Sequence, residues 1–325
     1  MQFLKLFAFL TVILLSFMVV GAVFEDWMAA REQQRYAGTP SDYLTLQNGI
    51  KIRVRRSGKA LPSVTVVMEA GLGGTSLDWG WIQKGLEGEA RIISYDRAGI
   101  GWSDAADGPV TATASAERLH DIMTQAGVGK VILVAHSLGA APALVYQHRY
   151  PGTVAGIVLV DPVHPDQMTR LPKVDVDGDH YFFSQVRIAA QLARFGLMRF
   201  FHLWSGFAAG LGQDAEDESR AINGGRRHLM TIEREINAWD LMMDEMRQAW
   251  PPANIPMVIL SSSLPDTEGT RMFQGLHVEM AKATPGATHE VVPGIDHQGL
   301  LTNPTTALYT INAIKRIIAG TMDHK

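Results

Sequence analysis

The order of hydrophobic and polar positions along the chain predicts an alternation of strands and helices. Short apolar runs have the pattern of strands that are buried on both faces of a parallel sheet. They are Val64–Met68, Arg91–Tyr95, Val131–Ala135 and Ile157–Val160. Helical stretches lie between them, at Ser115–Ala126 and at Leu138–Tyr150, which Pro151 ends. We expect an α/β domain with a mostly parallel central sheet and helices on both faces.

Further strands are expected before and after this alternation. Tyr43–Leu46 and Ile50–Arg55 flank Gln47-Asn48-Gly49, a sequence typical of a β-hairpin with an Asn-Gly turn. The strand pattern returns at Pro256–Ser261 and His289–Val292, and a closing helix is expected from Pro304 to Ile318. The α/β core is therefore predicted to comprise residues 43–162 and 253–325.

Between these two parts of the core, from about Pro162 to Pro252, apolar residues recur with the period of a helix. One set is Val186, Ala190, Ala193 and Leu197, and another is Ile232, Ile236, Trp239 and Met243. The segment is rich in Phe, Trp and Met, which form adaptable apolar surfaces. We predict that residues 163–252 are a helical cap over the carboxyl ends of the strands.

The amino terminus carries a long uncharged segment. Leu6 to Phe24 is a run of 19 residues without a charge, preceded by Lys5 and followed by Glu25 and Asp26. As a helix it would be roughly 28 Å long, close to the hydrocarbon thickness of about 30 Å of a bilayer. We expect residues 1–24 to be a membrane anchor with the amino end in the cytoplasm and the rest of the chain on the other side.

Two other interpretations of this segment stay open. One is a signal peptide cleaved after Val20-Gly21-Ala22, which would make the protein secreted. The other is a buried core helix. In each case the polar residues 25–42 are predicted to be a linker or connecting helix.

Composition narrows the classes of function. The 325 residues are 46% hydrophobic and 19% charged, which allows one large packed α/β domain. The net charge is −4 and no basic stripe is present, so a nucleic-acid partner is not expected. The chain has no cysteine, which excludes disulfides, a thiolate nucleophile and a cysteine-ligated metal site.

The candidate nucleophile is Ser137, in the segment Val131–Ala141. A buried strand leads directly into this serine and a helix follows at once, so the serine must adopt a strained backbone conformation. Small residues two positions before and after it, Ala135 and Gly139, avoid a clash with the neighbouring elements. Ala135 replaces the first glycine of the usual Gly-x-Ser-x-Gly pattern. The alternative is a serine that only caps a helix.

A tetrahedral oxyanion needs two hydrogen-bond donors directed at one point. The backbone N–H of Leu138, directly after the candidate nucleophile, is one candidate. The loop Glu69–Gly74 follows a predicted strand and contains three glycines, so we assign the second donor to the N–H of Leu72. The alternative is a glycine-rich turn without a ligand.

A serine hydroxyl requires a base to accept its proton. Among the 11 histidines, His297 follows the last predicted strand and could reach the carboxyl edge of the sheet. His136 is expected to point away from the site. For the acid that orients the imidazole, we favour Asp266, which lies between the serine and the histidine in the chain. Asp161, at the end of a strand, and Glu268 are the alternatives.

These ordered motifs resemble the α/β-hydrolase superfamily, in its serine hydrolase branch with a helical cap. They are Glu69–Gly74, Tyr95–Asp104, Ala135–Gly139, Val158–Pro162 and Gly294–His297. The resemblance implies hydrolysis without a metal or organic cofactor. Epoxide- and halide-processing relatives carry aspartate at the position of Ser137. The resemblance also implies that Asp96 and Arg97 hold loops together rather than act on the substrate.

We therefore expect a carboxylic ester hydrolase that uses Ser137, His297 and Asp266 on a small to medium hydrophobic ester. A C–C bond hydrolase or an aminopeptidase could use the same residues. The acidic residues that would then recognise a substrate amine are Asp214, Glu216, Asp217 and Glu218. A third possibility is a non-catalytic binding protein held at the membrane.

Overall fold

The computed structural model describes residues 1–58, 64–204, 210–252 and 255–322. It contains one eight-stranded sheet in the order β1-β2-β4-β3-β5-β6-β7-β8. β2 pairs antiparallel with both β1 and β4, and the remaining pairs are parallel. The strands are β1 (Tyr43–Thr45), β2 (Lys51–Ser57), β3 (Thr65–Glu69), β4 (Arg91–Tyr95), β5 (Val131–His136), β6 (Val154–Val160), β7 (Met257–Ser261) and β8 (Thr288–Val291).

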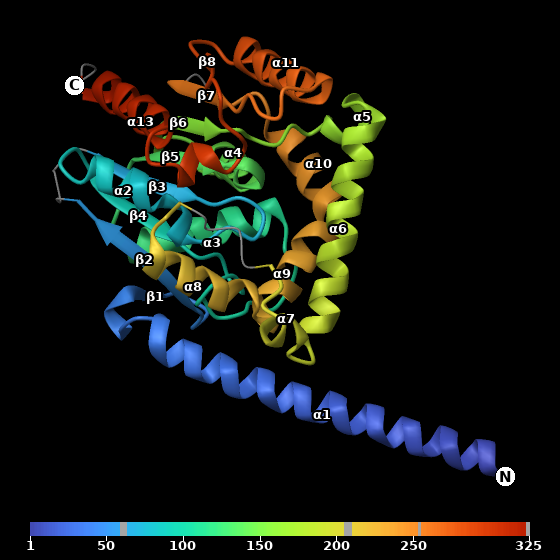
Figure 1. Ribbon diagram of the computed structural model, residues 1–325. Helices are drawn as coiled ribbons and strands as arrows, with labels where there is room; N and C mark the ends of the chain where they lie inside the picture. Colours follow the sequence, from blue (N-terminus) through green and yellow to red (C-terminus); the bar gives the residue numbers. More distant parts are fainter. Residues whose placement is uncertain (59–63, 205–209, 253–254, 323–325) are drawn as a thin grey trace.

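The mostly parallel sheet confirms the predicted fold class. Val, Ile and Leu dominate its central strands, and alternate residues of one strand pack on opposite faces. Val66 and Ile132 belong to one hydrophobic core, and Val67 and Leu133 belong to the other. Two apolar layers therefore hold the sheet between helices (Figure 1).

Helices cover both faces of the sheet. The core of the domain contains α2 (Gly80–Leu86), α3 (Ala112–Gln125), α4 (Ala140–Arg149), α11 (Glu268–Ala283), α12 (Gly299–Thr302) and α13 (Ala307–Met322), with short 3₁₀ helices η1 (Pro40–Asp42), η2 (Ser76–Trp79) and η3 (Ser137–Gly139). α3 and α4 pack on each other on one face. α2 and α13 pack together on the other.

Helices also fill the segment between β6 and β7, and we call them the cap. They are α5 (Gln167–Arg170), α6 (Lys173–Ala193), α7 (Leu197–Phe200), α8 (Gln213–Asn223), α9 (Arg226–Asn237) and α10 (Trp239–Ala249). Val186, Ala190 and Ala193 are buried on α6, as the helical period predicts. Leu197 lies beyond a break at Gly196, which has a φ of 68°. Residues 205–209 of the cap, 253–254 at its expected boundary with the core, and 323–325 lie outside the described residues.

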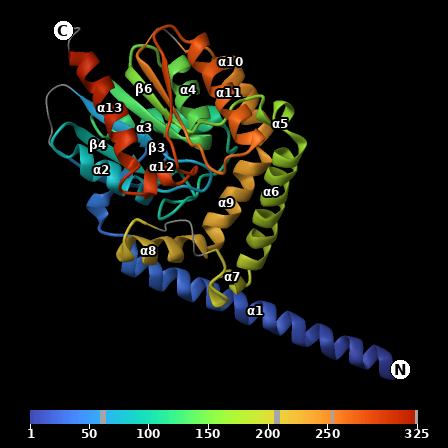
Figure 2. The same cartoon turned by 45° about the horizontal axis from the view of Figure 1, so that its top comes forward.

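The first helix, α1 (Gln2–Tyr36), is longer than the uncharged segment. Its amino-terminal half projects away from the body, and its second half runs along α7 and α8 (Figures 1 and 2). Residues 25–36 thus continue the helix, and only residues 37–42 connect it to β1. Among the described residues, α1 is the helix long and apolar enough to cross a membrane.

Candidate active site

Ser137 occupies a sharp turn between β5 and α4. Its φ is 51°, in the left-handed region that non-glycine residues rarely adopt. The neighbouring glycines explain why the turn can be this tight. A Cβ on Gly71 would lie 3.0 Å from the Cβ of Ser137, and a Cβ on Gly139 would collide with the carbonyl oxygens of Glu69 and Ala70. The strain and the close packing present the Ser137 side chain at the carboxyl end of the sheet.

His297 reaches the same place from the loop that follows β8. Its Nδ1 donates a hydrogen bond to Oδ2 of Asp161 at 2.7 Å. The loop is fixed by hydrogen bonds to the segment after β7, where the N–H groups of Ser263 and Leu264 both donate to the carbonyl of Ile295 at 2.9 Å. The His297 side chain is 41% exposed, whereas that of Asp161 is only 3% exposed.

Asp161 is held by more than its histidine. It follows β6 directly and has a φ of 46°. Its Oδ1 accepts from the N–H of Ser262 at 2.9 Å, and its Oδ2 accepts from the hydroxyl of Ser262 at 2.7 Å. Burial acts to raise the pKa of Asp161, but the hydrogen bond and charge of His297 and the Ser262 N–H hold the pKa well below its usual range. The carboxyl group is therefore an anion at neutral pH, and its negative charge favours a proton on Nδ1 of His297.

The expectation that Asp266 contacts His297 is wrong. The Asp266 side chain is 74% exposed and forms an ion pair with Arg271. Glu268 is exposed at the start of α11. Asp266 lies in the loop between β7 and α11, and Glu268 lies at the start of α11, whereas His297 turns toward the end of β6. The partner of His297 is Asp161, the alternative that lies at the end of a strand.

The expectation for His136 is also wrong, because its ring points toward the site. The centroids of the His136 and His297 rings are 4.4 Å apart. Nε2 of His136 donates to the carbonyl oxygen of His297 at 3.2 Å. Burial, together with the neighbouring His297, lowers the pKa of His136 to about 3, so His136 is neutral near pH 7. The hydrogen bond from neutral His136 to the carbonyl oxygen of His297 helps to hold the His297 loop in place.

The loop that carries the proposed oxyanion donor Leu72 is held from behind by Arg97. The guanidinium donates to the carbonyls of Ala70 at 2.6 Å and Gly71 at 2.7 Å. In a trans peptide the N–H and C=O point in opposite directions, so the N–H of Leu72 points away from Arg97. Within the described residues this N–H has no hydrogen-bond acceptor. The arrangement leaves it free for a ligand.

Arg97 also links this loop to the cap. It is buried between Glu69 of β3 and Glu235 of α9, with distances of 2.8 Å to each carboxylate. Glu235 additionally accepts from the N–H of Gly73 at 3.2 Å. Arg97 thus holds loops together, as the resemblance implies, and a cap residue that the sequence analysis missed completes the cluster.

Replacing Glu235 with alanine is expected to destabilise the protein by about 3–5 kcal/mol, because it leaves part of the Arg97 charge buried without a partner. Urea unfolding followed by circular dichroism measures this change. Glu233→Ala on the same helix is the matched control, since Glu233 contacts Gln191 on the surface. Equal stabilities of the two variants would contradict the structural role of the cluster.

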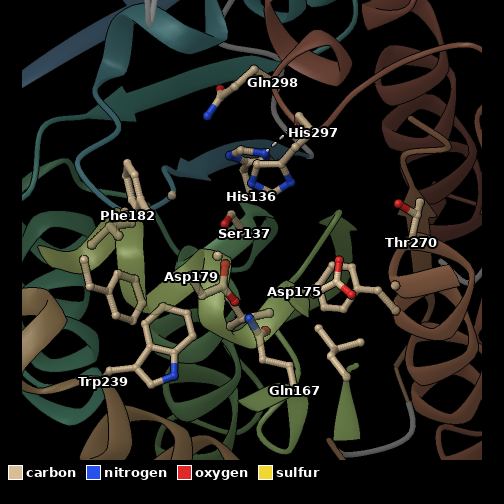
Figure 3. A pocket seen from close by; sticks show the side chains of 18 of the residues that line it. His136, Ser137, Gln167, Asp175, Asp179, Phe182, Trp239, Thr270, His297 and Gln298 are labelled. Carbon is tan, nitrogen blue, oxygen red and sulfur yellow. Dashed lines mark hydrogen bonds between the residues drawn. The ribbon is translucent and has the colours of Figure 1, made fainter. Parts of the chain in front are cut away.

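A cavity of about 600 Å³ opens beside Ser137 and His297 (Figure 3). Its apolar wall is formed by aromatic side chains of the cap and of α11, namely Phe182, Phe183, Trp239 and Phe273. Leu72 also lines the cavity. Ser137 lies beneath the two imidazole rings in Figure 3. The candidate nucleophile, the histidine and the Gly71–Leu72 loop therefore line one cavity.

Two carboxylates of α6 face the same cavity, and sequence reasoning missed both. Asp175 and Asp179 line it, with Asp179 pointing toward Ser137 (Figure 3). Burial raises the pKa of Asp179, and a hydrogen bond from Gln167 offsets this only in part. The spacing of four residues on one helix is the signal that could have placed both on one face.

The four acidic residues predicted to meet a substrate amine are on or near α8 and do not line this cavity. Glu218 instead accepts from Arg55 at 2.7 Å and from the indole of Trp102 at 2.9 Å. Asp217 pairs with Arg220. Among the described residues, no group of three or more histidine, aspartate or glutamate side chains is arranged to hold a metal ion.

Known proteins share this architecture. A family model described as "alpha/beta hydrolase fold" matches residues 64–214. An uncharacterized protein of Bacillus subtilis, YqjL, is 32% identical over 139 residues, which cover 39% of this chain and 55% of that protein. The alignment thus spans about half the length of this relative.

Solved structures resemble the whole fold at low sequence identity. A haloalkane dehalogenase variant from Bradyrhizobium elkanii aligns with a TM-score of 0.66 and 16% identity, covering 87% of this chain and 98% of that one. An esterase from Exiguobacterium antarcticum aligns with a TM-score of 0.62 and 18% identity, covering 85% and 98%. The family model and the shared fold agree with the ordered motifs of the sequence. The chain therefore has the α/β-hydrolase fold.

Proposed function

We propose that this protein is a serine hydrolase in which Ser137, His297 and Asp161 form the catalytic triad. The observation that carries the proposal is the 2.7 Å hydrogen bond that Asp161 accepts from His297, which lines the same cavity as Ser137 at its strained turn. Nucleophile, base and acid come from the loops after β5, β8 and β6. Together they support acyl transfer to water.

In this mechanism, Oγ of Ser137 attacks the substrate carbonyl carbon and its proton moves to Nε2 of His297. The negative charge that develops on the carbonyl oxygen is stabilised by the N–H groups of Leu72 and Leu138, each worth about 2.7–4 kcal/mol. His297 then gives its proton to the leaving alkoxide. A water molecule hydrolyses the acyl-enzyme by the same route, and Ser137 regains its proton.

A carboxylic ester with an apolar acyl group is the substrate class that the cavity supports best. The aromatic wall from Phe182, Phe183 and Trp239 favours hydrocarbon, and a volume of about 600 Å³ suits a small to medium group. A panel of p-nitrophenyl esters of increasing acyl length, assayed with the full chain in detergent, tests this. A maximum of kcat/KM at intermediate length is expected, and no hydrolysis of any ester would contradict the proposal.

A substrate with a protonated amine is the second candidate, and Asp175 and Asp179 favour it. An aminopeptidase or an esterase for amino-acid esters would place that amine against the two carboxylates. Aminoacyl p-nitroanilides and amino-acid esters belong in the same panel. If these substrates are preferred, Asp179→Asn should raise their KM and leave that of neutral esters unchanged.

We further propose that α1 is an uncleaved membrane anchor with its amino end in the cytoplasm. The apolar window of this helix has a mean hydropathy of 2.7 and none of it is buried against the protein. Gly21, which signal-peptide cleavage after Ala22 would remove, packs so closely on the cap that a Cβ would collide with the carbonyl oxygen of Phe195. Retention of the helix preserves this contact.

The anchor predicts that the full chain stays in the membrane pellet after alkaline carbonate extraction and that its intact mass includes residues 1–24. An apolar helix across the bilayer resists extraction, whereas a peripheral protein is released. A soluble protein that begins at Val23 would contradict the anchor and support the cleaved signal peptide.

A further inference from the structure

The second half of α1 packs on the cap through one stripe of residues. Met18, Gly21, Glu25, Met28 and Glu32 are among its less exposed positions and follow one another at intervals of three and four residues along the helix. The matching part of the cap is the segment Phe195–Leu203, which contains α7 and which we call the α7 turn. Figures 1 and 2 both show α1 passing beside it.

The two backbones approach each other closely at this crossing. A Cβ on Gly21 would collide with the Phe195 carbonyl, and a Cβ on Gly196 would lie 2.8 Å from the ring of Phe24 and 2.9 Å from the carbonyl oxygen of Gly21. Glycine on both sides therefore allows the contact. Because the approach involves backbone on both sides, the α7 turn lies at the level of Gly21 and Phe24 along α1.

Buried ion pairs fix this arrangement. Arg199 of the α7 turn donates to Glu25 at 2.7 Å and also pairs with Glu32, and these side chains are 7%, 2% and 15% exposed. Glu25 also accepts from the N–H of Arg226 at 2.8 Å. Charged groups buried with their partners require a defined geometry, since separating them would leave charges without water. The crossing of α1 and the cap is thus a rigid one.

The crossing sets the depth of the α7 turn relative to a membrane. The uncharged segment of α1 ends at Phe24, and Gly21 lies three residues before this end, or about 4.5 Å along the helix. A bilayer that contains the uncharged segment therefore has its interfacial layer beside the α7 turn. This step rests on the membrane anchor proposed above.

Large apolar side chains of the α7 turn are exposed at this level. Phe200 is 64%, Phe201 60% and Leu203 43% exposed. Trp27 of α1 is 56% exposed, and its ring centroid lies 6.3 Å from that of Phe24. The rings of Phe200 and Phe24 are 6.3 Å apart in an edge-on arrangement. Aromatic side chains at this height are typical of the interface between water and hydrocarbon.

We propose that the α7 turn inserts Phe200, Phe201 and Leu203 into the lipid interface of the leaflet from which the catalytic domain projects. A lipid surface is the occupant because the exposed side chains continue the apolar surface of the membrane-spanning part of α1. The turn also adjoins the cavity wall, since Trp204 stacks on Phe182 with centroids 6.1 Å apart. The cap is thereby held at the surface where apolar esters dissolve.

Single cysteines test this insertion directly, because the chain has no cysteine of its own. Phe201→Cys in the full chain is labelled with the fluorophore NBD and reconstituted in vesicles of phosphatidylcholine and phosphatidylglycerol. The vesicles contain lipids that carry a nitroxide quencher near the headgroup or deep in the acyl chain. Val12→Cys, in the uncharged segment, and Leu308→Cys, on α13 at the opposite side of the molecule, are the controls.

The label at position 201 is expected to lose most of its fluorescence to the shallow quencher and less to the deep one, and to resist aqueous iodide. The label at position 12 should be quenched by the deep nitroxide, and the label at 308 by iodide alone. Quenching at 12 without quenching at 201 would overturn the insertion and leave the anchor standing. If the deep nitroxide does not quench the label at position 12, both the insertion and the membrane anchor are overturned. If the unlabelled Phe201→Cys variant forms disulfide-linked dimers in vesicles and its labelled form is quenched by iodide, the surface belongs instead to a second copy of the chain.

Discussion

Asp161→Asn is expected to lower kcat for ester hydrolysis by about 10⁴-fold while leaving KM nearly unchanged. The carboxylate of Asp161 accepts the Nδ1 proton of His297 at 2.7 Å. An asparagine amide can donate to Nδ1 instead, which moves the imidazole proton to Nε2. His297 could then no longer accept the proton of Ser137. Steady-state assays with the preferred p-nitrophenyl ester measure the loss.

Asp266→Asn is the matched control, since Asp266 is exposed and pairs with Arg271 on the surface. It is expected to retain wild-type kcat, because removing a surface ion pair costs at most about 1 kcal/mol and leaves the cavity unchanged. The opposite result, in which Asp266→Asn is inactive and Asp161→Asn is active, would refute the assignment of Asp161.

Ser137→Ala is expected to reduce kcat/KM by about 10⁴–10⁶-fold, because no acyl-enzyme can form without the hydroxyl. The turn keeps its shape, since the left-handed conformation of residue 137 is imposed by the surrounding packing of Gly71 and Gly139. Hydrolysis of the preferred ester, corrected for the uncatalysed rate, measures the loss.

Ser184→Ala on α6 provides the comparison for this experiment. Its hydroxyl donates to the carbonyl of Tyr181 on the exposed side of the helix. This variant is expected to keep full activity, and both variants should unfold at the wild-type temperature. Residual activity of Ser137→Ala within tenfold of wild type would mean that another residue attacks the substrate.

The central strands of the fold could be predicted from the sequence because each is a short apolar run between turn signals. Arg91–Tyr95 has the predicted bounds, and β5 and β7 differ from prediction by one residue. Such strands are buried on both faces, so their composition carries the signal. The ends of α3 and α13 were less accurate, because helix termini depend on local capping and not on the apolar pattern.

The acid of the site could not be selected from the sequence, because its identity depends on side-chain geometry across three loops. Asp161 and Asp266 both follow strands and both lie between Ser137 and His297 in the chain. The backbone turn at Asp161 and the two hydrogen bonds from Ser262 direct one carboxylate to His297. Nothing in the spacing of the residues reports this convergence. The spacing of Asp175 and Asp179 could place them on one face of a helix, but only the tertiary fold shows that this face lines the cavity.

The packing of α1 on the cap was equally hidden in the sequence. Residues 25–36 are polar, and polarity favours a solvated linker. The structure shows that Glu25 is 2% exposed because Arg199, 174 residues away, neutralises it. A pairing over such a sequence distance is recognised only in the tertiary fold. The length of the uncharged segment, in contrast, can be read from the sequence.

The most direct test of the mechanism is to react the full chain with a fluorophosphonate probe and to locate the adduct by peptide mass spectrometry. A nucleophilic serine in a triad forms a stable covalent bond to phosphorus, whereas an ordinary hydroxyl does not react. One adduct per chain on Ser137, absent from His297→Ala, is the predicted result. A chain that remains unlabelled, or an adduct on any other residue, would contradict it.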